Sequence, residues 1–177
     1  MSHDPTAYDL GGDKSITDPR IRRVSGYANF GRRRRITMPF MTQVTDNLWH
    51  GGVGAGLILP DSIDYVLSLY QWQEYEFEHD LKERLTVEMY DSEGQGFDQV
   101  AELAEWVNRR RQEGTVLVHC QAGLNRSSVI VASALLLAGD VRTGREAVDL
   151  LRERRDPACL INPAFEDYIL AGGPLAA

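Results

Sequence analysis

The segment TVLVHCQAGLNRS, which runs from Thr115 to Ser127, decides the fold of this chain. Its first five residues are almost wholly apolar, as is typical of a central strand buried on both faces of a sheet. A short loop follows, and the apolar run 128–138, closed by Gly139, predicts a buried helix. Backbone N–H groups of such a loop, together with the dipole of the following helix, favour a bound anion. The segment therefore predicts a phosphate-binding loop between a buried strand and a helix.

Two residues of this loop carry reactive chemistry, Cys120 and Arg126. The field at the start of the helix favours the thiolate form of Cys120, which is a nucleophile without a separate base. The planar guanidinium of Arg126 can hold two phosphate oxygens at once. Gly123 allows the positive φ or the close approach that a tight loop needs. The pattern indicates a site where a bound phosphate faces a reactive thiolate.

Residues 119–127, HCQAGLNRS, match the signature H-C-x-x-G-x-x-R-[ST], and the chain resembles the protein tyrosine phosphatase superfamily, in particular its compact dual-specificity branch. The resemblance extends over roughly residues 43–171. It implies transfer of the phosphate to Cys120 and hydrolysis of the thiophosphate by water. It also implies that Ser127 assists departure of the thiolate and that His119 helps set the acidity of the thiol. The backbone donors to the phosphate would come from Gln121, Ala122, Gly123, Leu124, Asn125 and Arg126.

A phosphatase also needs a general acid that protonates the leaving oxygen, and Asp91 is the first candidate. It follows the segment LTVEMY at 85–90, precedes a glycine-containing loop and lies 29 residues before Cys120. The resembling family places its acid on a movable loop at this position. Glu93 and Asp98 are the alternatives, although Asp98 is more typical of a residue at a helix N-terminus.

Around the loop, extended and helical patterns alternate, which predicts an α/β fold. We expect a single domain, residues 41–177, with a central mixed, mainly parallel sheet flanked by helices. Strands are predicted at residues 44–50, 65–70 and 85–90, and helices over 97–113, from Thr143 and from Asn162 to Ile169. Thr143 with Glu146 forms a capping-box pattern, and Asn162 before Pro163 marks a helix start.

Residues 1–40 show no sustained periodicity and are rich in Gly, Asp, Ser and Arg. They contain 8 Lys and Arg against 4 Asp and Glu, whereas residues 41–177 contain 11 against 22, so the net charges are +4 and −11. We expect a basic N-terminal arm that is flexible or loosely packed. Its charge makes an acidic partner a candidate for this arm.

The composition limits the class of protein. The length suits one domain, no apolar run reaches the roughly 20 residues that span a bilayer, and the first residues do not resemble a signal peptide. A free catalytic cysteine suits a reducing compartment, so we expect a cytoplasmic protein. Cys159 is expected to be a packed thiol, with redox pairing to Cys120 as the alternative. The histidines lack metal-ligand spacing, so no metal or other cofactor is expected.

The resemblance leaves the substrate open. The first hypothesis is a phosphorylated protein, with phosphotyrosine favoured and phosphoserine and phosphothreonine included. The second keeps the chemistry but acts on a phosphoinositide, a phosphorylated glucan or an RNA 5′-phosphate. Residues 121–125 include no lysine that would neutralise a polyphosphorylated head group, and this absence favours a monophosphate substrate. Apart from the RNA 5′-phosphate alternative, no nucleic acid is expected as a partner. A non-catalytic phosphate-binding module is disfavoured because Cys120, Arg126 and Asp91 are all present.

Overall fold

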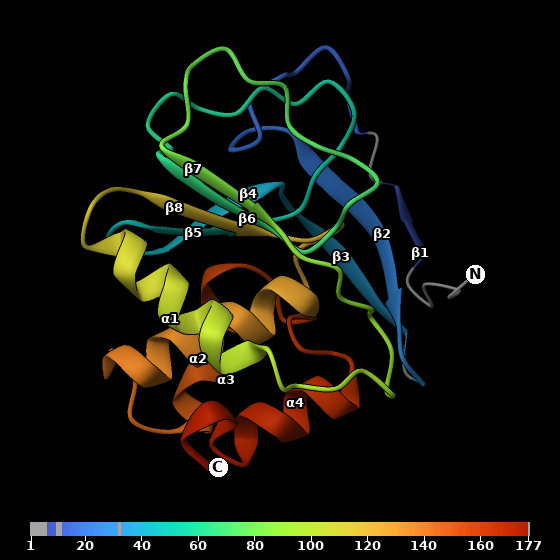
Figure 1. Cartoon of the computed structure of the whole chain (residues 1–177). Coiled ribbons are helices and arrows are strands. Elements are labelled where there is room, and N and C mark those ends of the chain that lie inside the picture. Colours follow the sequence, from blue (N-terminus) through green and yellow to red (C-terminus); the bar gives the residue numbers. More distant parts are fainter. Residues whose placement is uncertain (1–6, 10–11, 32, 177) are drawn as a thin grey trace.

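The computed structural model describes residues 7–9, 12–31 and 33–176, which form two sheets and a layer of helices (Figure 1). The larger sheet has five strands in the order β4-β5-β8-β6-β7. Strand β4 runs antiparallel to β5 and the other neighbouring pairs are parallel, so the predicted mixed, mainly parallel sheet is confirmed. The strands are β4 (Met41–Thr45), β5 (Leu48–Gly51), β6 (Tyr65–Ser68), β7 (Glu83–Thr86) and β8 (Val116–His119).

Strand β8 is the centre of this sheet and leads directly into Cys120. It pairs in parallel with β5 on one side and with β6 on the other, and all four of its residues are buried. The register places His119 beside Gly51 of β5 and Ser68 of β6. Parallel strands end at the same edge of a sheet, and ligands bind beyond that edge in open α/β folds. The loop after β8 therefore lies where such a fold places its binding site.

The four α-helices gather on one face of the five-stranded sheet, and loops cover the other face (Figure 1). Helix α2 is apolar all round, and eleven of its thirteen residues are buried. A helix of this kind must be packed on every side, and α1, α3 and α4 surround it. The helices are α1 (Val100–Arg111), α2 (Arg126–Ala138), α3 (Gly144–Arg154), α4 (Pro163–Leu170) and the short 3₁₀ helix η1 (Gly173–Ala176).

The predicted helix ends are confirmed. Gly139 ends α2 in the left-handed conformation, with φ of 77°. The Thr143 side-chain oxygen accepts a hydrogen bond from the Glu146 amide at 3.1 Å and so caps α3. Asn162 caps α4 in the same way. Local sequence signals therefore determine where these helices begin and end.

The single strand predicted at residues 44–50 is wrong, because this stretch belongs to a hairpin. Strands β4 and β5 pair in antiparallel fashion, with Thr45 opposite Leu48. Asp46 and Asn47 form the turn between them, and Asn47 has a φ of 61°. Asp and Asn are suited to such turns because their short polar side chains tolerate the left-handed conformation. The hairpin places β5 beside β8, directly next to the loop.

Strand β7 covers Glu83–Thr86. It therefore begins and ends earlier than the strand predicted at 85–90, and it is shorter. Val87 still donates a backbone hydrogen bond to Ser68 at 2.9 Å, after which the chain leaves the sheet. The burial of residues 83–90 alternates as expected, with Met89 buried between exposed neighbours. The end of this segment turns toward the loop after β8 and contributes to the site described below.

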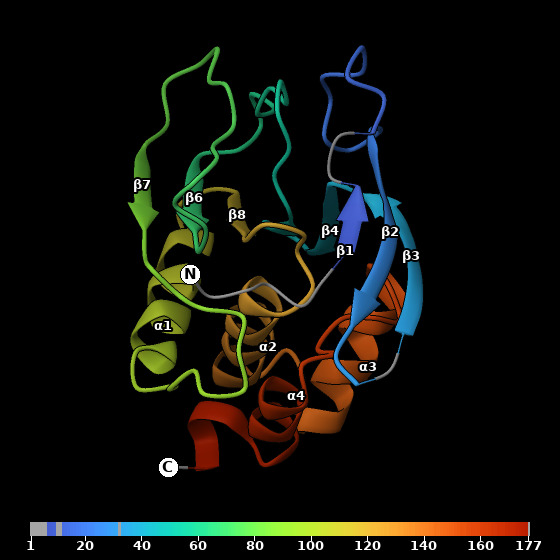
Figure 2. The same ribbon diagram turned by 90° about the vertical axis from the view of Figure 1, so that its right-hand side faces the viewer.

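The interpretation of residues 1–40 as a flexible or loosely packed arm does not hold for residues 23–39, which form an antiparallel sheet at the right-hand edge in Figures 1 and 2. Its strands are β1 (Ala7–Asp9), β2 (Arg23–Asn29) and β3 (Arg33–Pro39). Val24, Ala28, Ile36 and Met38 point into the core and are at most 1% exposed. Period-two alternation was present but was obscured by Gly26, Gly31 and the run of arginines at 32–35. Residues 1–6, 10–11 and 32 of the arm lie outside the described residues.

The arginines of this segment are divided between the core and the surface. Arg22 is fully buried, donates to the Ala55 carbonyl at 2.6 Å and lies over the Phe40 ring. Arg34 donates to the Pro157 carbonyl at 2.9 Å. Arg23, Arg33 and Arg35 are exposed. Arg22 and Arg34, which the sequence assigned to a free basic arm, therefore join the N-terminal segment to the rest of the domain through hydrogen bonds.

Candidate active site

The loop between β8 and α2 is held in place through its carbonyl groups, which are engaged on the outside of the loop. Five successive carbonyls accept hydrogen bonds. The bonds are Val53 N to Gln121 O (2.9 Å), Arg155 Nη2 to Ala122 O (2.8 Å), Arg155 Nε to Gly123 O (2.7 Å), Leu160 N to Leu124 O (2.7 Å) and Val129 N to Asn125 O (2.9 Å). The N–H and C=O groups of a planar trans peptide point in opposite directions. The N–H groups that follow these carbonyls are therefore turned toward the inside of the loop.

Cys120 lies at the base of this ring of N–H groups. Its amide donates to Gly51 O at 3.2 Å, and its sulfur accepts from the Gly123 N–H at 3.3 Å. Gly123 has a φ of 74°, and a Cβ at this position would overlap the backbone of Gly51 and the guanidinium of Arg155. Only glycine combines this conformation with this approach. Cys120 is 2% exposed, so the thiol is almost completely buried beneath the loop.

Ser127, at the start of α2, contacts the cysteine from behind. Its Oγ lies 3.2 Å from the Cys120 Sγ, within hydrogen-bond distance. On its other side the same oxygen lies 2.9 Å from Nε2 of His50, a residue of β5. The sulfur therefore belongs to a buried chain of polar side chains that continues beneath the loop.

His119 contacts the loop through the backbone carbonyl of Cys120, and its influence on the acidity of the thiol stays a prediction. Its Nδ1 lies 3.1 Å from the carbonyl oxygen of Cys120 and must carry a proton, because a carbonyl only accepts. Burial lowers the pKa of His119 to about 4, so the ring is neutral at physiological pH. The ring also packs edge-to-face against Tyr75, with centroids 5.4 Å apart. The structure thus places His119 at the junction of β8 and the loop.

Asp91 reaches the loop from the segment after β7. Its two carboxylate oxygens accept hydrogen bonds from Asn125 Nδ2 at 3.0 Å and from Asn162 Nδ2 at 3.1 Å. The Asn162 amide in turn donates to Asn125 Oδ1 at 3.0 Å. This network connects the general-acid candidate to the loop and to the N-terminus of α4. The Asp91 side chain is therefore held beside the ring of N–H groups.

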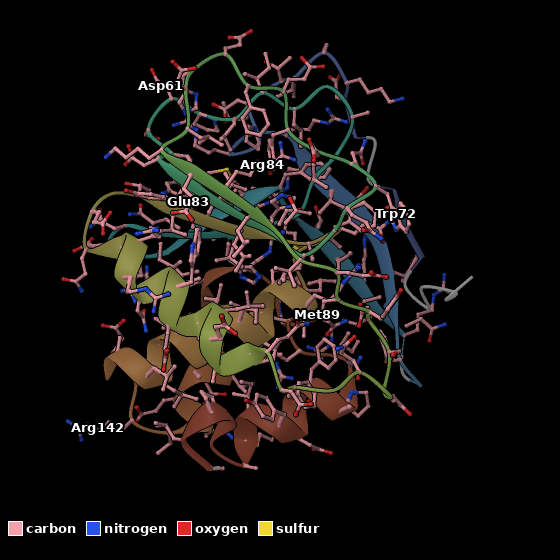
Figure 3. All side chains as sticks on the ribbon, viewed as in Figure 1. Asp61, Trp72, Glu83, Arg84, Met89 and Arg142 are labelled. Atoms are coloured by element: carbon pink, nitrogen blue, oxygen red, sulfur yellow. The ribbon has the colours of Figure 1, made fainter. Side chains whose placement is uncertain are left out.

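A cavity of about 210 Å³ opens above Arg126. Its floor includes Arg126, which donates to the Met89 carbonyl at 3.4 Å and lies over the Tyr70 ring. Met89 and Trp72, labelled in Figure 3, come from different loops and both line the cavity. Neither Glu93 nor Asp98 is among the lining residues. The lining residues are Leu69, Tyr70, Gln71, Trp72, Glu88, Met89, Tyr90, Asp91, Gln121 and Arg126.

The comparison with protein families agrees with this geometry. Residues 60–171 match the model of the dual specificity phosphatase catalytic domain. The chain belongs to this family. Catalytic domains of the family are protein-tyrosine and dual-specificity phosphatases, so the recognition made from HCQAGLNRS is confirmed.

Two relatives match this chain over short segments. It is 40% identical to MAP kinase phosphatase with leucine-rich repeats protein 3 of Dictyostelium discoideum over 65 residues. The matched segment is 37% of this chain and 7% of that protein. It is 38% identical to human dual specificity protein phosphatase 2 over 69 residues. This segment is 39% of this chain and 20% of that protein. The chain thus matches only a small part of the length of these relatives.

Solved structures show the same fold at low sequence identity. Human DUSP28 aligns with a TM-score of 0.58 and 19% identity, covering 74% of this chain and 90% of that chain. Human tyrosine phosphatase-like serine/threonine/tyrosine-interacting protein aligns with a TM-score of 0.59 and 18% identity. The alignment covers 73% of this chain and 92% of that chain. The α/β fold predicted from the sequence is the fold of this family.

Arg155 is a residue of this phosphatase domain that the sequence did not single out. Besides the loop carbonyls, its guanidinium donates to Pro39 O at 2.8 Å and to Thr42 Oγ1 at 3.0 Å. Burial lowers the pKa of the Arg155 guanidinium from its ordinary value. Arg155 therefore joins the back of the loop to the end of β3 and to β4. In the charged run 152–156 nothing distinguishes it from a surface arginine.

His50 and Asn162 were also missed as residues near the site. The sequence marks Asn162 as a helix cap, and the structure adds its hydrogen bond to Asp91. His50 is fully buried beneath the loop, whereas the sequence offered only the observation that it lacks metal-ligand spacing. Both residues are far from the signature in sequence, so only the folded chain brings them to it.

Cys159 is fully buried, and burial raises the pKa of its thiol to about 11. A thiol that stays protonated and has no access to solvent reacts slowly with oxidants, which agrees with a packed thiol. Across residues 7–9, 12–31 and 33–176, no group of three or more His, Cys, Asp or Glu is placed to hold a metal ion. None of the described helices is long and apolar enough to cross a membrane.

Proposed function

We propose that this domain is a cysteine-dependent phosphatase that hydrolyses phosphate monoesters through a cysteinyl-phosphate intermediate, with phosphotyrosine of proteins as its best substrate. The observation that carries the proposal is that the loop carbonyls accept hydrogen bonds on the outer side of the loop. The N–H groups of the same peptides therefore point inward, above the Cys120 sulfur. Such a ring stabilises the negative charge that develops on the transferring phosphate. The family match supports the same reaction class.

In the first step, phosphate oxygens accept hydrogen bonds from the N–H groups of residues 121–126 and from the Arg126 guanidinium. The Cys120 thiolate attacks phosphorus, the S–P bond forms and the bond from phosphorus to the ester oxygen breaks. Asp91, in its protonated form, gives its proton to that oxygen, so the product leaves as a neutral alcohol or phenol. The network from Asn125 and Asn162 holds Asp91 at the cavity for this transfer.

In the second step, water hydrolyses the intermediate. The Asp91 carboxylate takes a proton from the water as its oxygen attacks phosphorus, and the S–P bond breaks with its electron pair going to sulfur. The Ser127 hydroxyl, 3.2 Å from the sulfur, donates a hydrogen bond to the departing thiolate. Inorganic phosphate then leaves and the enzyme returns to its starting state.

The cavity favours an aromatic monophosphate. Tyr70, Trp72 and Tyr90 line it, and Arg126 is the one lysine or arginine among its lining residues. Glu88, also in the lining, adds negative charge at the rim. A polyphosphorylated head group would need several cations, whereas the ring of phosphotyrosine can stack on the aromatic side chains. Cys120 is buried below the rim, so the longer tyrosine side chain reaches it better than phosphoserine or phosphothreonine.

Partners and location remain predictions. Phosphorylated proteins are the expected substrates. The outer face of β2 and β3 presents Arg23, Arg33 and Arg35 to solvent, and an acidic partner of the N-terminal segment would pair with these residues. The cytoplasmic location likewise stays a prediction from the free catalytic thiol.

The proposal is tested with Cys120→Ser and an aryl phosphate in the presence of a chelator. Turnover should fall on the order of 10⁵-fold or more while phosphopeptide binding survives, because a neutral hydroxyl at this position has no base to activate it. Cys159→Ala is the matched control and should keep wild-type turnover. Turnover of Cys120→Ser near the wild-type level would remove Cys120 from the mechanism.

Substrate class is tested with a panel of phosphotyrosyl, phosphoseryl and phosphothreonyl peptides, a phosphoinositide, a phosphorylated glucan and an RNA 5′-phosphate. The phosphotyrosyl peptide should have the highest kcat/KM. A higher kcat/KM for the inositide, the glucan or the RNA end would contradict the proposed substrate while leaving the chemistry intact. Absence of turnover on every substrate, together with phosphopeptide binding, would indicate a phosphate-binding module.

A further inference from the structure

His50 lies beneath the catalytic loop, outside the signature, with its imidazole facing the start of α2. The residue is fully buried. Its Nε2 lies 2.9 Å from Ser127 Oγ and 3.2 Å from Ser128 Oγ. Ser127 Oγ is in turn 3.2 Å from Cys120 Sγ. A continuous chain of hydrogen-bond distances therefore runs from His50 through Ser127 to the nucleophile.

The ring of His50 is neutral, because burial and the nearby charge of Arg155 hold its pKa well below its ordinary value. A neutral imidazole carries one proton, on Nδ1 or on Nε2. Among the described residues, none accepts from or donates to Nδ1, which is itself buried. A proton on Nδ1 would leave a buried N–H without a partner, and such groups are rare in folded proteins. The proton therefore belongs on Nε2, and Nδ1 keeps only an unpaired lone pair.

The position of this proton decides what the two serines do. With the proton on Nε2, the ring donates to Ser127 Oγ, and the hydroxyl hydrogen of Ser127 is left to point at the Cys120 sulfur. With the proton on Nδ1, Ser127 would donate to Nε2 instead, and the sulfur would lose its side-chain donor and keep only the Gly123 N–H. Ser128 agrees with the first arrangement, since its hydroxyl hydrogen-bonds with the Cys159 thiol and its oxygen remains free to accept from Nε2.

We propose that His50 is a positioning residue that fixes the Ser127 hydroxyl in the orientation that donates to the sulfur of Cys120. The inference rests on the proposed phosphatase function and deepens it. During hydrolysis of the intermediate, the S–P bond breaks and sulfur receives its electron pair. Ser127 keeps its proton and stabilises the new thiolate through the oriented hydrogen bond. His50 exchanges no proton with the substrate and acts only through Ser127.

The kinetic test uses His50→Leu with an aryl phosphate under pre-steady-state conditions. Loss of the oriented donor should slow the second step about 10- to 100-fold, which corresponds to a hydrogen bond to a charged group. The variant should release a burst of about one equivalent of phenol per enzyme, followed by a slow steady state. Because the second step becomes rate-limiting, kcat and KM should fall together while kcat/KM changes little.

Three further variants separate positioning from packing. His50→Gln carries a side-chain N–H near the position of Nε2 and should recover much of kcat. Adding His50→Leu to Ser127→Ala should cause no additional loss, because the two residues act as one unit. Ser133→Ala is the matched control: it is a buried serine of the same helix whose Oγ has no partner among the described residues, and it should show no burst.

Equal losses in kcat and kcat/KM without a burst, or additive losses with Ser127→Ala, would overturn the proposal and leave His50 as a packing residue. If His50→Leu does not fold, nitrogen NMR of wild-type protein labelled at histidine reads the tautomer directly. A proton on Nε2 of His50 supports the inference, and a proton on Nδ1 overturns it. The NMR result does not depend on turnover, so it stands even where the aryl phosphate assay shows that the proposed function is wrong.

Discussion

The two sides of the phosphate-binding loop differ in how they are built. The side that faces the cavity presents N–H groups, the Arg126 guanidinium and the Asp91 carboxylate to solvent and substrate. The side that faces the core is closed by Arg155, His50 and the backbone of neighbouring segments. In the proposed mechanism the front supplies the groups that touch a phosphate, whereas the back supplies groups that contact the loop and the segments behind it.

The residues that we propose to react with a phosphate therefore differ from the residues that hold the loop in its conformation. A loop of six peptide groups with all N–H groups pointing inward is a concentration of like dipoles, and it persists only if the carbonyls are engaged elsewhere. Arg155 engages two of them with one buried cation. Substitutions at the front should therefore change rate more than stability, and substitutions at the back should change both.

Apart from loss of the nucleophile itself, the largest effect is expected from Asp91→Asn at the front. Without the proton donor, turnover of tyrosyl phosphate should fall about 10²- to 10⁴-fold, and much less with an ester whose leaving group is very acidic. Steady-state rates on both esters, with a thermal melt of each variant, measure this. Glu93→Gln, in the same loop but outside the cavity lining, is the matched control and should keep both rates. An equal loss on both esters would show that Asp91 only positions the loop.

Arg155→Met tests the back of the loop. Four acceptors, including the carbonyls of Ala122 and Gly123, lose their donor, so the free energy of unfolding should fall by about 3–5 kcal/mol. Chemical denaturation measures the change, and turnover of the folded fraction should also fall. Arg154→Met, exposed on the same helix, should change stability by no more than about 0.5 kcal/mol. Wild-type stability of Arg155→Met would remove the distinction between front and back.

Acid should weaken the back of the loop through His119. Its folded pKa of about 4 lies below the ordinary 6.5, so the unfolded chain takes up a proton first as the pH falls. The resulting loss of stability begins near pH 6.5 and reaches about 3 kcal/mol near pH 4. Denaturation curves from pH 7 to pH 4, for wild type and for His119→Gln, measure it. The variant should lose less stability over this range, and parallel curves would contradict the assignment.

The smallest effects concern the N-terminal sheet, where Arg155 donates to Pro39. Ile36 is fully buried and its neighbour Arg35 is exposed on the opposite face of β3. Ile36→Ala should therefore lower the free energy of unfolding by about 2–4 kcal/mol, and Arg35→Gln should change it by no more than about 0.5 kcal/mol. Thermal melts of the pair measure this difference. Equal, small shifts would restore the interpretation of this segment as a loosely packed arm.

Several features could be predicted from local sequence because short-range chemistry determines them. The apolar strand 116–119, the glycine at 123 and the caps at Thr143 and Asn162 each depend on a few neighbouring residues. The turn at Asp46 and Asn47 and the alternation of residues 24–38 were also present locally. They were misread because a hairpin resembles a single strand, and because four consecutive arginines hide a buried face.

The sequence by itself indicated the reaction class that we propose, since the candidate nucleophile, the arginine expected to hold the phosphate and the predicted ring of backbone N–H groups lie within eight consecutive residues. It also indicated the strand, loop and helix that place this loop at the edge of a sheet. Only the tertiary structure decided which residues close the loop from behind. Arg155 and His50 lie 28 or more residues from the signature, and no local sequence pattern shows that they are close to it in space. Burial then converts an ordinary arginine and histidine into a fixed cation and a neutral donor, because an enclosed polar group must find its partner within the protein.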